Sequence, residues 1–382
     1  MIHFRPGSHA YDIVSVIGIT GEFPYRSVRL FGNARTYKVL IGRLCEVQTF
    51  RDYNSGDEMT CRLLTVTGKS FGKTVRLYKA AIPILRWISP YAEENYLSAS
   101  WNHGFPGDIS HTERNHRVAE AAIMCIRAGI KSRPYELPKL QNEVIKRMEF
   151  NQPSFYFAKS LKHIGQTEMN KTMFTRIAGA IFINHNCYAV YNTRNAVMKW
   201  NGMGEFKTLH SLIEVARLNA GVSQIDTAIL FGESYKTAYK TMLENQKNRR
   251  LEFRFDGIYR HIHFVPMNEF GIRLLQILII PDRKQKLLDL LFEPECRSND
   301  LGAFEYDAYI NGVYVLSFLD SDIARLMRFS EARSYRTETL EVLCFPEQVE
   351  LIKNSLGTDV SIKTIGLEQI EDALSGGDAN GQ

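Results

Sequence analysis

The sequence lacks the signatures of several large protein classes. Its six cysteines are scattered over 382 residues without a CxxC pair, which argues against a zinc ribbon and a dithiol redox motif. No apolar run approaches the roughly 20 residues that a membrane-spanning helix needs. HExxH and GxGxxG are absent, and the first residues include no apolar signal segment. We therefore expect a cytoplasmic protein with reduced thiols and no membrane partner.

Charge is distributed unevenly along the chain. Residues 1–90 hold 13 Lys and Arg against 6 Asp and Glu, a net charge of +7, whereas the other residues hold 34 against 36. A basic N-terminal module on a nearly neutral body is typical of a protein that binds a polyanion at one end. The alternative is a chance excess of cations on a solvated surface.

The first 80 residues predict three short helices followed by a β-hairpin. The helices are expected over 10–20, 23–32 and 34–47, with Asn33 capping the third. Strands are expected over 48–53 and 58–66, and a fourth helix over 70–77. The buried stripe of the third helix is predicted to be Val39, Leu40, Leu44 and Val47. This order of elements predicts an α+β winged helix-turn-helix.

In a winged helix the third helix enters the major groove, and the hairpin reaches the adjacent minor groove or its phosphates. Some polar residues of these elements could instead only solvate the surface, and a winged helix can also bind protein. The candidate DNA-binding residues are Arg26 and Arg29 on the second helix, Arg35, Thr36, Lys38 and Arg43 on the third, and Arg51 and Arg62 in the hairpin.

A competing motif lies just after the predicted hairpin. Gly68 to Thr74 has the composition of a phosphate-binding loop, but one residue too few separates its two glycines. A shortened loop would not wrap phosphates with its amides in the usual way. We therefore favour the winged helix over a nucleotide hydrolase.

Residues 81–150 are expected to form a connector and then a helix from about Ser110 to Ala128, ended by Gly129. That helix begins with the pattern H-x(3)-N-x-R-V, formed by His111, Asn115, Arg117 and Val118. The segment from Leu64 to Gly68 has the pattern LTxxG.

Together these motifs resemble the replication-relaxation family of plasmids and integrative elements, over roughly residues 10–130. The resemblance implies a winged-helix protein that assists DNA replication or mobilisation. A relaxase or a replication protein is then a candidate partner.

Residues 151–374 predict a mixed α/β domain, because strands and helices alternate there. Hairpins are expected over 176–193 and over 304–319, the second with a type I′ turn at Asn311-Gly312. The tail, residues 375–382, is rich in Gly, Asn and Asp, and we expect it to be disordered. Further strands are predicted over 224–234, 261–266, 340–345 and 360–366.

A metal-dependent nuclease in this domain, active or degenerate, is the alternative function. Its nearest candidates are Glu205, Lys207 and Asp226, although Glu205 follows a Gly-rich loop rather than lying on a strand. His261 and His263 alternate on one strand and so point the same way, which suits a half-exposed strand face better than a metal site. We assign no catalytic residue, metal or cofactor.

The sequence therefore predicts a winged-helix domain over 1–80, a connector with a helical segment over 81–150, and a mixed α/β domain over 151–374. The expected function is binding of duplex DNA, specific for sequence or structure. It would serve plasmid or mobile-element replication, mobilisation or transcriptional control. The α/β domain would form a homodimer or recruit a partner protein.

Overall fold

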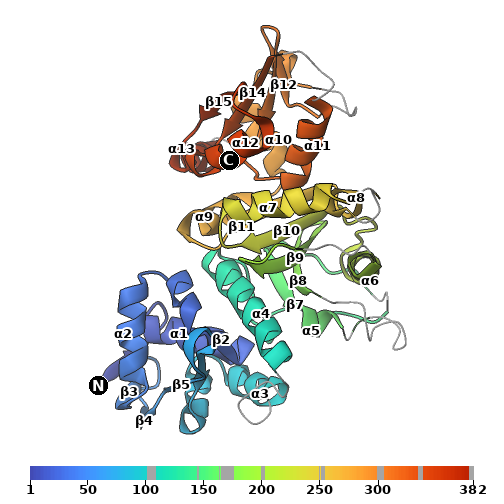
Figure 1. Cartoon of the computed structure of the whole chain (residues 1–382). Helices are drawn as coiled ribbons and strands as arrows, with labels where there is room; N and C mark the ends of the chain where they lie inside the picture. Colours follow the sequence, from blue (N-terminus) through green and yellow to red (C-terminus); the bar gives the residue numbers. More distant parts are fainter. Residues whose placement is uncertain are drawn as a thin grey trace. The chain divides into compact units, whose positions relative to one another are not determined.

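The computed structural model describes residues 1–100, 109–143, 146–162, 164, 176–198, 203–248, 250, 254–298, 305–333 and 339–377. The fold is mixed α/β, with helices and several sheets (Figure 1). Contacts divide the chain into two compact units. Unit 1 comprises Met1–Lys139 with Ser154–Phe157, and unit 2 comprises Leu140–Pro153 with Ala158–Gln382.

Unit 1 begins with the predicted first and third helices, but its second helix differs from the prediction. Residues 23–32 divide into a strand, β2 (Glu22–Pro24), and a 3₁₀ helix, η1 (Tyr25–Phe31). Phe23 is fully buried and pairs with Val75, a partner some fifty positions away that local periodicity does not reveal. The confirmed helices are α1 (His9–Thr20) and α2 (Ala34–Leu44).

The predicted hairpin is present, and a second hairpin follows it. The first sheet has the order β1-β3-β4 and the second β2-β6-β5. The helix predicted over 70–77 is wrong: a short 3₁₀ turn over Ser70–Gly72 leads into β6. Thr74, Val75 and Leu77 are buried there because β6 pairs on both sides. The strands are β1 (Ile2–Phe4), β3 (Val47–Asp52), β4 (Glu58–Arg62), β5 (Leu64–Thr67) and β6 (Thr74–Leu77).

The expected connector is largely helical where the structure describes it. It contains the 3₁₀ helix η3 (Lys79–Trp87) and α3 (Pro90–Ala99), whose first turn is capped by Ser89. The helix predicted from about Ser110 is confirmed as α4 (Ile109–Arg127), and Gly129 follows it with a φ of +83°. A short strand, β7 (Ser154–Phe157), completes unit 1.

A buried polar network connects α4 to the preceding elements of unit 1. Glu22 on β2 forms an ion pair with Arg76 on β6, and Ser27 on η1 donates a hydrogen bond to Glu120 on α4. His116 Nε2 lies 3.1 Å from the Thr74 hydroxyl. Burial raises the pKa of Glu22, although Arg76 opposes the shift. The network fixes η1 and β2 against α4.

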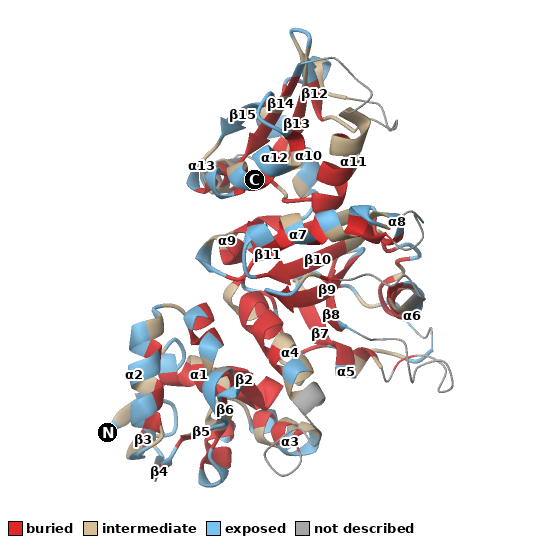
Figure 2. Cartoon of the chain, in the orientation of Figure 1, coloured by how far each residue is buried: buried red, intermediate tan, exposed pale blue. Residues whose placement is uncertain are grey.

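Unit 2 contains two sheets with the same topology. Unit 2 contributes four strands to the first sheet, in the order β11-β10-β9-β8, with β8 antiparallel to β9 and the other pairs parallel. Its strands are nearly continuous apolar runs, coloured as buried in Figure 2. Its elements are α5 (Ala158–Leu161), β8 (Ile177–Ile183), β9 (Asn186–Arg194), α6 (Met203–Ala220), β10 (Thr227–Gly232), α7 (Tyr235–Gln246), α8 (Phe255–Ile258), β11 (His261–Pro266), α9 (Glu269–Leu278) and α10 (Arg283–Leu291).

The second sheet has the order β12-β13-β14-β15, again with one antiparallel pair followed by two parallel pairs. Asn311 and Gly312 both have positive φ, which confirms the predicted hairpin turn. The tail beyond Gly377 lies outside the described residues. The elements are η7 (Pro294–Cys296), β12 (Ala308–Ile310), β13 (Val313–Ser317), α11 (Ile323–Arg333), β14 (Thr339–Cys344), η8 (Pro346–Gln348), α12 (Val349–Leu356), β15 (Ser361–Thr364) and α13 (Leu367–Gly377).

The two halves of unit 2 repeat one arrangement: a hairpin, then helix and parallel strand twice, then a closing helix. Each hairpin closes through two residues, between Ile183 and Asn186 and between Ile310 and Val313. When the two halves are aligned at these turns, strand pairing makes Phe231 equivalent to Phe345. A glutamate follows each phenylalanine two residues later. Unit 2 thus contains a topological repeat.

Asp322 joins the two halves. Its buried carboxylate accepts hydrogen bonds from His261 Nδ1 at 2.6 Å and from the backbone amide of Ile262 at 3.0 Å, both on β11. The same carboxylate accepts from the amides of Ala324 and Arg325 in the first turn of α11. Burial alone raises the pKa of this carboxyl, but the hydrogen bond and charge of His261 outweigh it and leave the pKa well below its usual range.

Gly271→Ala is expected to destabilise unit 2. A Cβ at this position would lie 1.7 Å from the carbonyl oxygen of Pro266, and that backbone cannot move without disturbing β11. We expect a loss of about 1–3 kcal/mol or more in urea unfolding of the full chain.

The matched control is Gly42→Ala on α2, where nothing lies within 4 Å of the added Cβ. That change should leave stability unchanged or raise it by up to about 1 kcal/mol, because alanine favours a helix interior. Equal stability of the two variants would contradict the close approach at Gly271.

Candidate nucleic-acid interface

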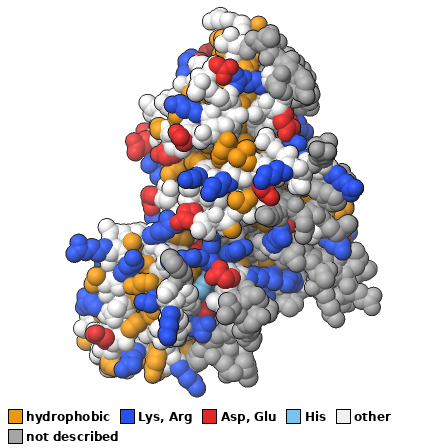
Figure 3. All heavy atoms as spheres, viewed as in Figure 1, with side chains coloured by type: hydrophobic (Ala, Val, Ile, Leu, Met, Phe, Trp, Pro, Cys, Tyr) orange, Lys and Arg blue, Asp and Glu red, His pale blue; other side chains and the backbone are white. Residues whose placement is uncertain are grey.

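The exposed surface of residues 1–90, the first part of unit 1, is more basic than their sequence alone indicates. Of the 13 Lys and Arg in residues 1–90, twelve are exposed, and the exception is Arg76. Of the six Asp and Glu, only Glu46, Asp57 and Glu58 are exposed. In the view of Figure 3, blue side chains are frequent over this unit and red ones are few. Burial of the acids concentrates positive charge at the surface.

The helix α2 has one buried side and one basic side. Tyr37, Ile41 and Leu44 are buried, at the i, i+4, i+7 spacing of a single helix face. Arg35 and Lys38 are exposed on the opposite side. Within Ala34–Leu44 there is no acidic residue. The helix therefore presents cations and no acidic residue to solvent.

The predicted buried stripe of this helix is partly wrong. Val39 and Val47 are each 60% exposed, Leu40 is half-buried and only Leu44 is buried as expected. The tertiary packing rotates the helix so that Tyr37 and Ile41 contact the core instead. Val39 lies among the exposed cations.

Local contacts fix the position of α2. The Asn33 side chain accepts hydrogen bonds from the amides of Arg35 and Thr36, at 3.0 and 3.2 Å. The Tyr37 ring stacks on Phe31, with ring centroids 5.5 Å apart, and its hydroxyl lies 3.5 Å from Asp12. Burial and Asp12 together raise the pKa of Tyr37 to about 12, so it stays a neutral phenol.

The hairpin of β3 and β4 carries the other two predicted contacts. Arg51 pairs in register with Glu58 near the tip, and their charged groups lie 3.9 Å apart with both side chains about half exposed. Arg62 pairs with Val47 at the base of the hairpin. The cross-strand hydroxyls of Thr49 and Thr60 are 2.9 Å apart. Both arginines remain exposed.

All eight predicted DNA-binding residues are exposed. Arg26 and Arg29 lie on η1, where the neighbouring Ser27 and Val28 are buried. Thr36 and Arg43 are exposed on α2. The structure therefore leaves every one of these side chains accessible to a partner of unit 1.

The motifs of the family resemblance lie on α4 and β5. Asn115 and Arg117 are half-buried, and the side chain of His111 lies outside the described residues. The neighbouring His116, which the motif does not include, belongs to the buried network. Gly68 has a φ of +83°, and a Cβ there would meet the Gly72 carbonyl oxygen at 2.5 Å. His116 and Gly68 therefore have structural roles in unit 1.

The segment from Gly68 to Thr74 is a turn between two antiparallel strands. It also has the spacing Gly-x-Ser-x-Gly around Ser70, so the expectation that this motif is absent is wrong. A nucleophile elbow needs a turn from a strand into a helix, and a phosphate-binding loop needs a following helix. Here β6 follows, so neither site forms.

The nuclease candidates do not form a metal site. Glu205 is buried on α6 and forms an ion pair with Arg176 at 2.9 Å, whereas Lys207 is exposed. Asp226 precedes β10 and lines a separate cavity. Among the described residues, no group of three or more His, Cys, Asp and Glu side chains is arranged to hold a metal ion.

The expected half-exposed face at His261 and His263 is wrong for His263, which is almost completely buried. The two rings stack in parallel, 6.4 Å apart. Both histidines face polar groups from the loop before α11, a contact with residues some sixty positions later in the chain.

The comparisons with known proteins show no relative. No protein-family model, curated protein or solved structure matches this chain at a significant level. No helix in the described part of the chain is both long and apolar enough to cross a membrane.

Removing the Asn33 cap should weaken α2. Asn33→Ala leaves the amides of Arg35 and Thr36 without this acceptor, and we expect a loss of about 1 kcal/mol in the stability of unit 1. Asn33→Asp should preserve stability, because a carboxylate accepts the same bonds at a helix N-terminus. Urea unfolding followed by circular dichroism measures both. An alanine variant as stable as wild type would exclude this capping role.

Proposed function

We propose that unit 1 binds duplex DNA, and the observation that carries the proposal is its surface charge. Twelve exposed cations face solvent against three exposed acids in residues 1–90. A polyanion gains from such a surface because each neutralised phosphate releases condensed counterions. This term supplies most of the affinity for any duplex, whatever its sequence.

The arrangement of elements supports a winged helix-turn-helix as the binding module. In this proposal α2 is the recognition helix in the major groove, and the hairpin of β3 and β4 is the wing. The absence of acids on α2 removes repulsion from the phosphates on either side of the groove. Its basic side stands opposite the residues that attach it to the core, so groove binding requires no repacking.

The predicted residues then divide by role. Arg35, Lys38 and Arg43 on α2 contact base edges and flanking phosphates, and Thr36 lies beside them in the first turn of the helix. The exposed Arg26 and Arg29 on η1 would hold the DNA backbone. Arg51 and Arg62 would contact the adjacent minor groove or its phosphates from the wing.

The wider role rests on the family resemblance of residues 10–130. We propose a cytoplasmic protein that assists replication, mobilisation or transcriptional control of a plasmid or mobile element. Unit 2 would form a homodimer or recruit a relaxase or replication protein. The topological repeat of unit 2 offers two similar α/β surfaces for such partners.

The double variant Arg35→Ala/Lys38→Ala should bind duplex DNA at least about tenfold more weakly than wild type at about 0.1 M salt, because two cations leave the groove. Its plot of log affinity against log salt should be shallower by about 2, roughly one per lost phosphate contact. Fluorescence anisotropy of the full chain with a labelled duplex measures both quantities.

The matched control is Lys236→Ala/Lys240→Ala, which removes two exposed cations from α7 in unit 2. Its affinity and salt slope should equal those of wild type. If both double variants lose affinity equally, α2 is not the helix that contacts the DNA. If wild type binds no duplex even at low salt, unit 1 is not a DNA-binding module.

A further inference from the structure

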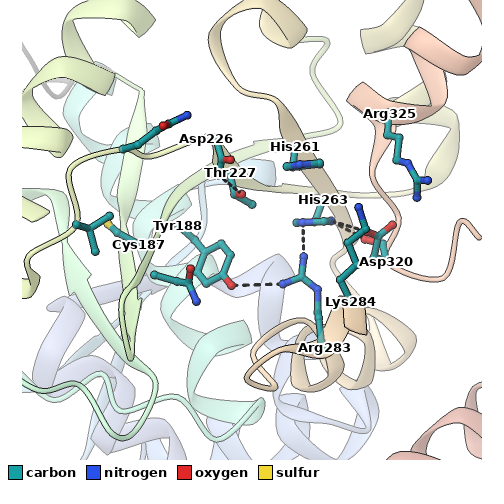
Figure 4. Close-up of a pocket in the computed structure, with 13 residues that line it drawn as sticks. Cys187, Tyr188, Asp226, Thr227, His261, His263, Arg283, Lys284, Asp320 and Arg325 are labelled. Atoms are coloured by element: carbon teal, nitrogen blue, oxygen red, sulfur yellow. Dashed lines mark hydrogen bonds and ion pairs between the residues drawn. The ribbon is translucent and has the colours of Figure 1, made fainter. Parts of the chain in front are cut away.

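Unit 2 contains a polar cavity of about 110 Å³ that the proposed function does not use (Figure 4). It lies where β9, β10 and β11 begin, beside the first turn of α10 and the loop before α11. Thr227 and His261 are register partners on adjacent strands, so their side chains share one face of the sheet there. The cavity is therefore built from segments that only folding brings together.

Arg283 at the first position of α10 forms one wall of this cavity. Its guanidinium donates to the Leu278 carbonyl at 2.9 Å and to the Tyr188 hydroxyl at 3.3 Å. It also donates to His263 Nε2. A guanidinium has no acceptor, so His263 Nε2 must be the unprotonated nitrogen, and Nδ1–H donates to the Asp320 carbonyl at 2.8 Å.

These contacts hold Arg283 without neutralising it. Burial, together with the charge of Arg283, lowers the pKa of His263 to about 4, so the imidazole is uncharged at neutral pH. The three acceptors of Arg283 are thus all neutral, and no carboxylate among the described residues lies within ion-pair distance of it. A fixed cation with only neutral partners favours an anionic ligand.

Two further groups add to this wall. Lys284, the next residue, is exposed at the cavity and likewise has no ion-pair partner among the described residues. Asp282, which precedes the helix, has a φ of +54° and gives no side-chain cap to the first turn of α10. The backbone amides of that turn therefore add partial positive charge beside the two cations.

The other lining residues supply hydrogen-bonding groups rather than further unpaired cations. Arg325 is 7% exposed and is paired with Asp307 at 2.7 Å, while its Nε has no hydrogen-bond partner. His261 directs Nδ1 to Asp322 at 2.6 Å, which leaves its Nε2 free of that bond. The carboxylates of Asp226 and Asp320 also line the cavity, where they would repel a bare anion but accept hydrogen bonds from hydroxyl groups.

We propose that this cavity is a binding site for a phosphate monoester that carries hydroxyl groups, such as a sugar phosphate. The phosphate binds Arg283 and Lys284 at the start of α10, and the hydroxyls bind Asp226 and Asp320. Cations and carboxylates both line the cavity, which is why a phosphate with an attached polyol suits the site better than phosphate alone. The site lies wholly within unit 2 and does not depend on DNA binding by unit 1.

Calorimetric titration of the full chain with ribose 5-phosphate, ribose and inorganic phosphate tests the proposal. Wild type should bind ribose 5-phosphate, bind inorganic phosphate at least about tenfold more weakly, and not bind ribose. Lys284→Ala should weaken the binding of ribose 5-phosphate at least about tenfold. Its exposed side chain has no structural partner among the described residues, so this variant should fold normally.

Two further variants separate the roles of the walls. Asp226→Ala should weaken the binding of ribose 5-phosphate. Its affinity for inorganic phosphate should be unchanged or higher. Arg283→Gln should abolish binding of both, with circular dichroism as the check on folding. Lys236→Ala, an exposed cation on α7, is the control and should bind as wild type does.

A competition experiment with duplex DNA identifies the source of the phosphate. A duplex that competes with ribose 5-phosphate for wild type, but not for Lys284→Ala, would mean that the cavity binds a phosphate of the DNA backbone. Without competition the ligand is a free ester. If wild type binds neither phosphate compound at millimolar concentration, or if Lys284→Ala and Arg283→Gln bind as wild type, the proposal is overturned.

Discussion

The Asp322 carboxylate is the contact on which the arrangement of unit 2 depends. It accepts four hydrogen bonds, two from β11 and two from the first turn of α11, and so connects the two halves of the repeat. A buried charge is costly unless it is paired and hydrogen-bonded, and here both conditions are met. The same carboxylate orients the imidazole of His261, which lines the cavity.

The two units differ in the distribution of their charged groups. In unit 1 the acids Glu22 and Asp52 are buried in structural contacts, which leaves the exposed surface basic. In unit 2 the buried ionic groups Arg254, Asp322 and Arg325 are paired. At the start of α10, by contrast, Arg283 and Lys284 have no ion-pair partner among the described residues. Long-range attraction therefore favours a polyanion at unit 1, whereas the cavity of unit 2 can select a small ligand by its hydrogen bonds.

Much of the fold follows from local signals in the sequence. The cap at Asn33, the hairpin turn at Asn311-Gly312 and the stop at Gly129 all lie where the residue types require them. The candidate DNA-binding residues were identified in the same way and are all exposed. Elements that depend on distant partners were missed, above all β2 and β6, because Phe23 and Val75 are apolar residues that a helix would also accommodate.

The sequence by itself determined where charge is concentrated, where turns occur and which elements precede the basic helix, because these depend on composition and on neighbours a few residues apart. Only the tertiary structure decided which side of α2 faces the core, since Tyr37 and Ile41 rather than Val39 fit against the packed elements. It also decided that His261, Arg283 and Asp320 line one cavity. Their sequence separations of twenty to sixty residues carry no local signal, and the packing of α10 and of the loop before α11 against β11 brings them together.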